Sequence, residues 1–105
     1  MAIIYISAPY TKGDVAVNVN RVIHIANRIM DMGHIPYVPH LTHFWHIITP
    51  RPYHDWMQID LALLGRCDAL LRLDGESHGA DLEVAAAQKL GIPIYYSWEE
   101  IKELV

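Results

Sequence analysis

The sequence predicts an α/β fold, in which a small parallel sheet of about four strands carries helices on both faces. Two observations support this prediction. Short apolar segments of strand length alternate with longer segments whose apolar residues recur at helical spacing, and glycines and prolines separate the segments. An alternating order of strands and helices gives a parallel sheet with right-handed crossovers. Such a sheet binds ligands at the carboxyl ends of its strands, so we expect the functional residues there.

The first half of the chain contains two of the expected strands and one amphipathic helix. A run rich in β-branched residues at 3–7 predicts a buried strand, and Asp14 is placed to cap the helix that follows. Gly33 is expected to end this helix, before a second strand at 35–38. The proline-rich residues 39–53 are expected to be irregular. Spacings of three and four residues predict the buried face of the helix: Val19, Val22, Ile23, Ala26, Ile29 and Met30.

The second half of the chain continues the alternation. In order, we expect a helix at about 53–66, a strand at 68–73, a turn at 75–79, an alanine-rich helix at 80–90, a strand at 92–96 and a short helix opened by a capping box at 97–100. The residues of the first of these helices that are expected to face the core are Trp56, Ile59, Leu63 and Leu64. Polar, glycine and proline residues gather where the strands end, as a site at that edge requires.

The composition excludes several classes of protein. The chain has 105 residues, 52% of them hydrophobic, and a formal net charge of −4, which predicts one compact domain over residues 1–105. It has no cluster of Lys and Arg for a nucleic-acid polymer, and no apolar run approaches the roughly 18 residues that span a membrane. Cys67 is the lone cysteine, which excludes an internal disulfide and fits a cytoplasmic location.

Two carboxylates are candidates for chemistry. Glu83 lies about four residues into the helix expected at 80–90, where unpaired N–H groups keep a carboxylate ionised and able to attack a developing cation. Asp60 lies among apolar neighbours in a helix, a setting that raises a carboxyl pKa toward that of a general acid. The alternatives are an ordinary acidic residue in a first helical turn and a solvent-facing aspartate. Asp74, which ends a strand, is a weaker candidate.

Two helix N-termini, at 11–14 and 77–80, offer backbone N–H groups to an anion. Thr11, Lys12 and Ser77 add side-chain donors at these places. A phosphate site is physically reasonable there, although the chain has neither a glycine-rich dinucleotide fingerprint nor a P-loop. Simple capping of both helices by Ser and Asp side chains is the alternative.

His40, His43 and His46 have the spacing of a metal site. On a helix their rings would share about one third of the circumference, and zinc takes three or four such ligands. Because prolines on both sides disfavour a regular helix, we expect no metal here. The other interpretation is that the segment stacks or hydrogen-bonds against a flat ligand such as a nucleobase. The aromatic side chains available for this are Phe44, Trp45, His46 and Trp56.

Three stretches of the chain form an ordered set. They are Tyr-Ile-Ser-Ala-Pro-Tyr at 5–10, Asp-Leu-Ala-Leu-Leu-Gly-Arg-Cys-Asp at 60–68 and Ser-His-Gly-Ala-Asp-Leu-Glu at 77–83. Together they resemble the nucleoside 2-deoxyribosyltransferase superfamily, and residues 36–45 resemble a stretch of its small bacterial and phage members, whose function is not assigned. The resemblance covers nearly the whole chain. It implies a three-layer Rossmann-like fold of the flavodoxin type and cleavage of an N-glycosidic bond.

The resemblance also implies roles for single residues. Glu83 matches the superfamily's nucleophile on the sugar C1′, Asp60 matches an aspartate that assists at the base or sugar, and Tyr5 matches a tyrosine that orients the glutamate. Ser77 matches the serine that contacts phosphate in the branch that hydrolyses 5′-monophosphates. The residues expected to bind substrate are Ser7, Pro9, Tyr10, Thr11, His43, Trp45, His46, Asp74, Ser77 and Gly79.

These observations predict an enzyme that cleaves the N-glycosidic bond of (deoxy)nucleosides or their 5′-monophosphates. Glu83 would form a glycosyl-enzyme, Asp60 would protonate the departing base, and water or a second base would resolve the intermediate. We expect no metal or organic cofactor, and a homodimer or higher homo-oligomer. The alternatives are a non-catalytic nucleotide-binding module on the same fold and a histidine-ligated metal hydrolase.

Overall fold

The computed structural model describes residues 1–101 and contains a four-stranded sheet. The elements in chain order are β1 (Ile3–Ser7), α1 (Val15–Asp31), β2 (Ile35–Tyr37), the 3-10 helix η1 (Pro39–Thr42), α2 (His43–Ile48), α3 (Tyr53–Leu64), β3 (Ala69–Arg72), α4 (His78–Leu90), β4 (Ile94–Tyr95) and α5 (Trp98–Ile101). All four strands are parallel and lie in the order β2-β1-β3-β4. The predicted α/β fold is therefore confirmed.

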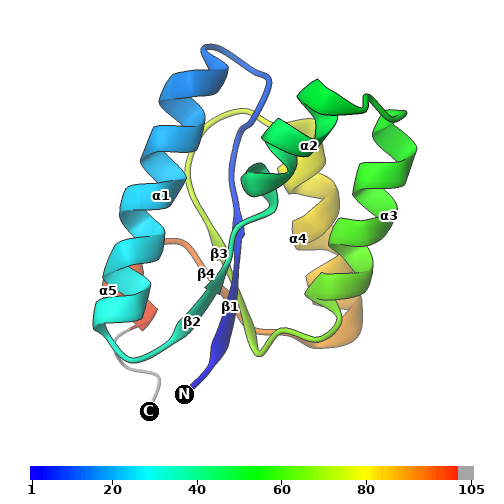
Figure 1. The fold of residues 1–105 in the computed structure, drawn as a ribbon. Coiled ribbons are helices and arrows are strands. Elements are labelled where there is room, and N and C mark those ends of the chain that lie inside the picture. Colours follow the sequence, from blue (N-terminus) through cyan, green and yellow to red (C-terminus); the bar gives the residue numbers. More distant parts are fainter. Residues whose placement is uncertain (102–105) are drawn as a thin grey trace.

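The sheet is the middle of three layers (Figure 1). Helices α1 and α5 cover one face, and α2, α3 and α4 lie on the other. Side chains of β1 alternate between these faces, because successive residues of a strand point in opposite directions. Ile4 and Ile6 join the core beneath α1 and α5, whereas Tyr5 packs with Leu64 of α3 and Ala87 of α4. The polar side chains of β1 thus point toward the layer that contains α3 and α4.

The carboxyl ends of β1 and β3 lie side by side at the edge where the strand order reverses. Ser7 of β1 is in register with Arg72 of β3, and β2 pairs with the other side of β1. The loops that leave these two ends touch. Gly75 has φ +116°, and a Cβ added there would lie 2.8 Å from Cγ of Pro9, so this approach requires glycine. The edge is the topological switch point at which such folds bind ligands.

Local signals placed the helix ends well. The Asp14 side chain accepts a hydrogen bond from the backbone N–H of Val17 at 3.1 Å and so caps α1, as predicted. Gly33 and Gly91 follow α1 and α4 with φ of +86° and +74°, the left-handed conformation that commonly ends helices. These capping interactions depend on residues a few positions apart, which is why the sequence reveals them.

Other predicted boundaries were wrong. Residues 39–53 are not irregular, since they contain η1, α2 and the start of α3. Pro39 stands in the first turn of η1, where the missing N–H costs no hydrogen bond. α4 begins at His78, because Ser77 caps it, and Glu83 therefore lies in the second helical turn rather than the first. The strands β3 and β4 are also shorter than predicted.

The apolar faces of α1 and α3 are narrower than predicted. Val22, Ala26 and Ile29 are buried in α1, but Ile23 and Met30 are exposed, and so is Leu63 in α3. Helical spacing identifies a stripe, whereas its buried width depends on how much of the helix the sheet covers.

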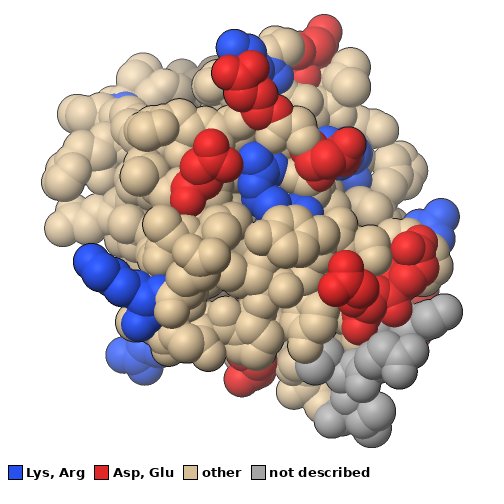
Figure 2. Space-filling view, turned by 180° about the vertical axis from the view of Figure 1, so that it is seen from behind, with Lys and Arg blue, Asp and Glu red and all other residues tan. Residues whose placement is uncertain are grey.

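Acidic and basic side chains are interspersed on the face opposite to the view of Figure 1 (Figure 2). Within residues 1–101 no helix combines the length and hydrophobicity needed to cross a membrane.

Candidate active site

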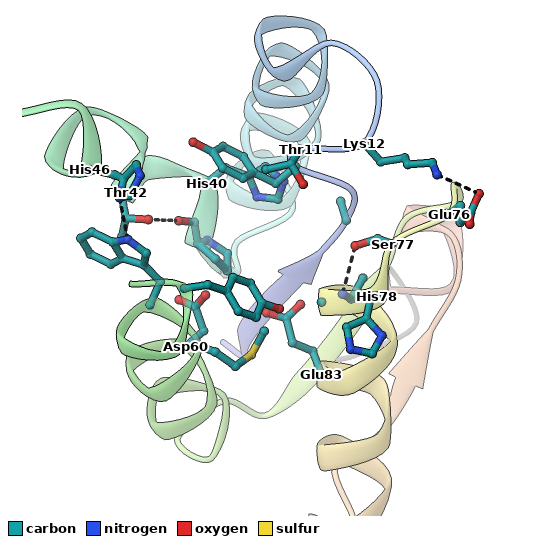
Figure 3. A pocket seen from close by; sticks show the side chains of 18 of the residues that line it. Thr11, Lys12, His40, Thr42, His46, Asp60, Glu76, Ser77, His78 and Glu83 are labelled. Atoms are coloured by element: carbon teal, nitrogen blue, oxygen red, sulfur yellow. Dashed lines mark hydrogen bonds and ion pairs between the residues drawn. The ribbon is translucent and has the colours of Figure 1, made fainter. Parts of the chain in front are cut away.

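A cavity of about 690 Å³ opens at the carboxyl edge of the sheet. It lies between the loop after β1, the η1–α2 segment, α3 and the start of α4, so residues far apart in the sequence share its wall (Figure 3). Cavities of this size hold small-molecule ligands. Seven of the predicted site residues line it: Tyr10, Thr11, His46, Asp60, Ser77, Gly79 and Glu83.

Glu83 of α4 is the most firmly held group of the cavity. Its side chain is only 6% exposed. The Tyr5 hydroxyl donates a hydrogen bond to its Oε2, and the Ser7 hydroxyl donates to its Oε1 at 2.7 Å. Because Tyr5 and Ser7 are two residues apart on β1, they point to the same side of the sheet and hold both carboxylate oxygens. The carboxylate is thus fixed in one orientation by a rigid strand.

The charge state of Glu83 reflects competing effects. Burial raises the pKa of its carboxyl above the ordinary value, because desolvation disfavours the charged form. The hydrogen bonds from Tyr5 and Ser7 and the positive charge of Arg72 act in the opposite direction. Burial and the adjacent Glu83 charge raise the pKa of the Tyr5 phenol, so this phenol stays protonated and remains a donor. The sequence-based argument placed first-turn amides beside Glu83, but the structure supplies side-chain donors instead.

Asp60 of α3 faces Glu83 from the opposite side of the cavity (Figure 3). Its Oδ1 is buried and has no hydrogen-bond partner among the described residues. Burial, followed by the Glu83 charge, raises the pKa of Asp60 to about 7, although interaction with Tyr37 acts in the opposite direction. A carboxyl with this pKa exchanges its proton near neutral pH, which is the property that a general acid and base requires. Two nearby carboxyls with unequal surroundings are a common acid–base arrangement.

The N-terminus of α4 forms another part of the wall. The Ser77 hydroxyl accepts a hydrogen bond from the backbone N–H of Ala80 at 3.1 Å, so the capping interpretation describes this side chain. A Cβ added to Gly79 would lie 3.0 Å from the hydroxyl of Tyr53, which shows how closely α3 approaches α4. Lys12 and Glu76 form an exposed ion pair of 3.5 Å at the rim.

Aromatic and histidine side chains form the wall opposite the sheet. His46 Nδ1 accepts hydrogen bonds from Nε1 of Trp56 at 2.9 Å and from the backbone N–H of Arg51 at 3.3 Å. Trp45 packs edge-on against Trp56, with ring centroids 4.9 Å apart. These contacts connect α2 to the start of α3 and leave His46 and Trp56 on the cavity surface.

Six predicted site residues do not line the cavity. Tyr5 and Ser7 lie beneath it and contact Glu83, whereas His43 lies behind Tyr10 and bonds to the Tyr10 hydroxyl. Asp74, with a side chain 97% exposed, pairs with Arg21 of α1 outside the cavity. The other two are Pro9, whose carbonyl bonds to His40, and Trp45, which is half exposed.

The sequence-based list omitted several residues of the cavity. Tyr53 and Met57 are one helical turn apart on α3, and Tyr53 lies beside Gly79. Their spacing to Asp60, at seven and three residues, was a helical-face signal that was available. His40 was considered only within a metal motif, and it lines the cavity with a buried ring. Arg72 lies outside this cavity and had no local signal, because its effect on the pKa of Glu83 depends on the packing of α4 against β3.

The three histidines with metal-like spacing have separate partners. His40 bonds to the Pro9 carbonyl, His43 to Tyr10, and His46 to Trp56 and Arg51. Across residues 1–101, no three His, Cys, Asp or Glu side chains come together in a group that could hold a metal ion. Of these three histidines, His40 and His46 line the cavity.

The fold is similar to that of a solved 2-deoxyribosyltransferase. A solved 2-deoxyribosyltransferase from the psychrotolerant bacterium Bacillus psychrosaccharolyticus superposes with a TM-score of 0.70 over 99% of this chain and 93% of that chain. The two sequences are 16% identical, so the likeness describes the fold. A search of curated proteins finds no match.

A family model identifies the chain more narrowly. The model described as "Domain of unknown function (DUF7768)" matches residues 2–97, and the chain belongs to this family.

Proposed function

We propose that this protein cleaves the N-glycosidic bond of a 2′-deoxynucleoside or its 5′-monophosphate and transfers the sugar to water or to another base. The observation that carries this proposal is the pair of unlike carboxyls facing one cavity. Glu83 is buried and held by two hydroxyl donors, and Asp60 opposite it has a pKa of about 7. Further support comes from the fold shared with a 2-deoxyribosyltransferase that is described as a biocatalyst for nucleoside synthesis.

In the first step, an oxygen of the Glu83 carboxylate forms a bond to C1′ while the bond from C1′ to the base nitrogen breaks. The electron pair of the broken bond remains on the base, which takes a proton from Asp60. Tyr5 and Ser7 keep the attacking carboxylate in line. Positive charge that develops on the sugar lies next to the Glu83 carboxylate, so attraction is greatest in the transition state.

In the second step, water attacks C1′ and the bond to Glu83 breaks. Asp60 accepts a proton from this water, which restores both carboxyls to their starting states. A second base could replace the water, in which case its ring nitrogen attacks C1′ and its proton goes to Asp60. The residues proposed to surround the substrate are Tyr10, Thr11, His46, Ser77 and Gly79, with Trp56 and Tyr53 as apolar surfaces.

The test is a panel of 2′-deoxynucleosides, ribonucleosides and their 5′-monophosphates, with free base followed by chromatography. We expect the wild type to release base and Glu83→Gln to lose at least about 10³-fold in kcat, because glutamine is a poor nucleophile. Release that is equal in wild type and variant would show that Glu83 is not the nucleophile. A nucleotide that raises the melting temperature without any release of base would favour the non-catalytic binding module instead.

A further inference from the structure

Two buried side-chain atoms of the described residues have no hydrogen-bond partner, Nδ1 of His40 and Oδ1 of Asp60. Both residues line the same cavity. An unpaired buried acceptor costs free energy, because it has lost its bond to water and gained nothing in exchange. Such groups are rare in folded proteins and call for a specific explanation. Because both residues belong to the wall of one cavity, a ligand that packs against this wall and displaces it slightly is a candidate for completing their bonding.

The bonding of His40 identifies its protonation state. Its Nε2 lies 2.9 Å from the carbonyl oxygen of Pro9, and a carbonyl only accepts, so Nε2 is the nitrogen that bears the hydrogen. The ring is only 6% exposed, and burial lowers the pKa of His40. The neutral ring therefore has a lone pair on Nδ1. His40 is held as a hydrogen-bond acceptor and not as a cation.

In the neighbouring histidines Nδ1 already has a partner. Nδ1 of His46 already accepts from Trp56 and from the backbone of Arg51, and Nδ1 of His43 is bonded to the hydroxyl of Tyr10. Of the three histidines in residues 39–48, only His40 has a ring nitrogen shown to be buried without a partner. This difference makes His43 and His46 internal controls for any measurement on His40.

We propose that His40 is a ligand-binding residue whose Nδ1 accepts a hydrogen bond from an uncharged N–H or O–H donor of the substrate. The inference rests on the proposed function for the identity of the ligand, a nucleoside or nucleotide. In a nucleoside the donor is either an N–H of the base, exocyclic or in the ring, or a hydroxyl of the sugar. A dianionic phosphate cannot take this place, because it has only acceptor oxygens to offer to a lone pair.

The test measures the ¹⁵N shift of His40 Nδ1 by long-range ¹H–¹⁵N correlation, with three small probes that the proposed reaction cannot consume. 9-Methyladenine has an amino group as its only donor, 9-methylpurine has no donor, and 2-deoxyribose has hydroxyls. In the free protein we expect Nδ1 far downfield, as an unbonded imine nitrogen. An upfield shift with 9-methyladenine assigns the donor to the base, and one with 2-deoxyribose assigns it to the sugar. 9-Methylpurine should leave Nδ1 unchanged and bind about tenfold more weakly than 9-methyladenine if the base is the donor.

Three results would overturn the inference. An upfield ¹⁵N shift of His40 Nδ1 in the free protein would mean that this nitrogen already accepts a hydrogen bond from water. If a probe changed the chemical shifts of other cavity residues and left that of Nδ1 unchanged, the hydrogen-bond donor of the ligand would lie elsewhere. If no NMR signal of a cavity residue changed with any probe, nucleobases and deoxyribose would be excluded as ligands of His40. Base release is measured separately. If the protein released base but the Nδ1 shift of His40 did not change with any probe, this inference would be wrong and the proposed function would still be supported.

Two variants give an independent test. In His40→Gln the amide N–H can still reach the Pro9 carbonyl, but the acceptor at the Nδ1 position is lost. In His40→Asn the amide oxygen lies near that position, while the bond to Pro9 is lost. We expect the Gln variant to bind the donor-bearing probe about tenfold more weakly and the Asn variant to keep its preference. Equal affinities of both variants and wild type would contradict the assignment, and thermal unfolding confirms that each variant folds.

Discussion

The two walls of the cavity are built differently. On the β1–α4 wall, both oxygens of the Glu83 carboxylate accept hydrogen bonds from hydroxyls of a central strand. On the wall formed by η1, α2 and α3, Asp60 and His40 each have a buried acceptor without a partner. The first wall is complete before a ligand arrives, whereas the second retains bonding capacity.

The two walls also differ in packing. The sheet side contains Tyr5, Leu70 and other fully buried residues, whereas no residue of α2 is buried. Phe44 and Ile48 of α2 are 71% and 78% exposed. The difference suggests that the protein fixes its proposed nucleophile on the rigid wall and recognises the ligand with the less tightly packed one. Substitutions in the two walls should therefore have distinct effects.

The largest expected effect is on the rigid wall. Tyr5→Phe removes the donor to Glu83 Oε2 and should lower kcat for base release about 10²- to 10³-fold, because a preorganised charge contact is lost. Steady-state kinetics measure this loss. Tyr95→Phe, on the side of the sheet covered by α1 and α5, is the matched control and should leave kcat nearly unchanged. Similar losses in both variants would indicate a general effect of phenol removal.

A matched pair of apolar truncations tests the packing difference. Leu70→Ala in β3, which packs with Tyr5 on the cavity side of the sheet, truncates a fully buried side chain and should cost about 3 kcal/mol in the free energy of unfolding. Ile48→Ala in α2 should change it by less than about 0.5 kcal/mol, because this side chain is already exposed. Urea unfolding followed by circular dichroism measures both values. A large cost at Ile48 would mean that α2 packs against something in solution, such as the expected second copy.

The charge of Asp60 makes stability depend on pH. Its pKa is raised from 3.8 to about 7, so the folded state binds a proton more tightly than the unfolded state, and this stabilisation is lost as pH rises from about 4 to about 7. Asp60→Asn removes the titrating group. The stability advantage of the variant over wild type should grow by about 2 kcal/mol from pH 4 to pH 8, about half of the unscreened value, because Asp60 is partly solvated. An advantage independent of pH would contradict the raised pKa.

The smallest expected effect concerns the approach of α4 to α3. The Cβ in Gly79→Ala would lie 3.0 Å from Tyr53 Oη and 3.6 Å from Met57 Cε, and the half-exposed Tyr53 can move to accommodate it. We expect KM to rise about fivefold to tenfold with kcat changed less than about twofold, since only binding space is reduced. Gly65→Ala, outside the cavity, should leave KM unchanged. A loss of kcat in the Gly79 variant would indicate that α4 had shifted and displaced Glu83.

The fold and part of the site could be predicted because their signals are local. Asp14 and Gly91 were readable as helix ends from neighbouring residues, and Tyr5 and Ser7 were readable as one face of a strand from their spacing of two. The motifs around Asp60 and Glu83 identified two carboxyls worth testing, and the structure places both at one cavity. Their catalytic roles stay predictions.

The features of the site that the sequence did not predict depend on which segments pack together. Asp74 was predicted to end a strand, but β3 ends two residues earlier, and the Asp74 side chain pairs with Arg21, a contact across 53 residues that no local pattern encodes. His40 bonds to a carbonyl 31 residues away, and only this contact reveals which ring nitrogen is free. Spacing and composition therefore determined the order of strands and helices and the supply of reactive side chains. Tertiary packing decided which of them meet, because hydrogen bonds and desolvation act over a few ångströms of space and are independent of distance along the chain.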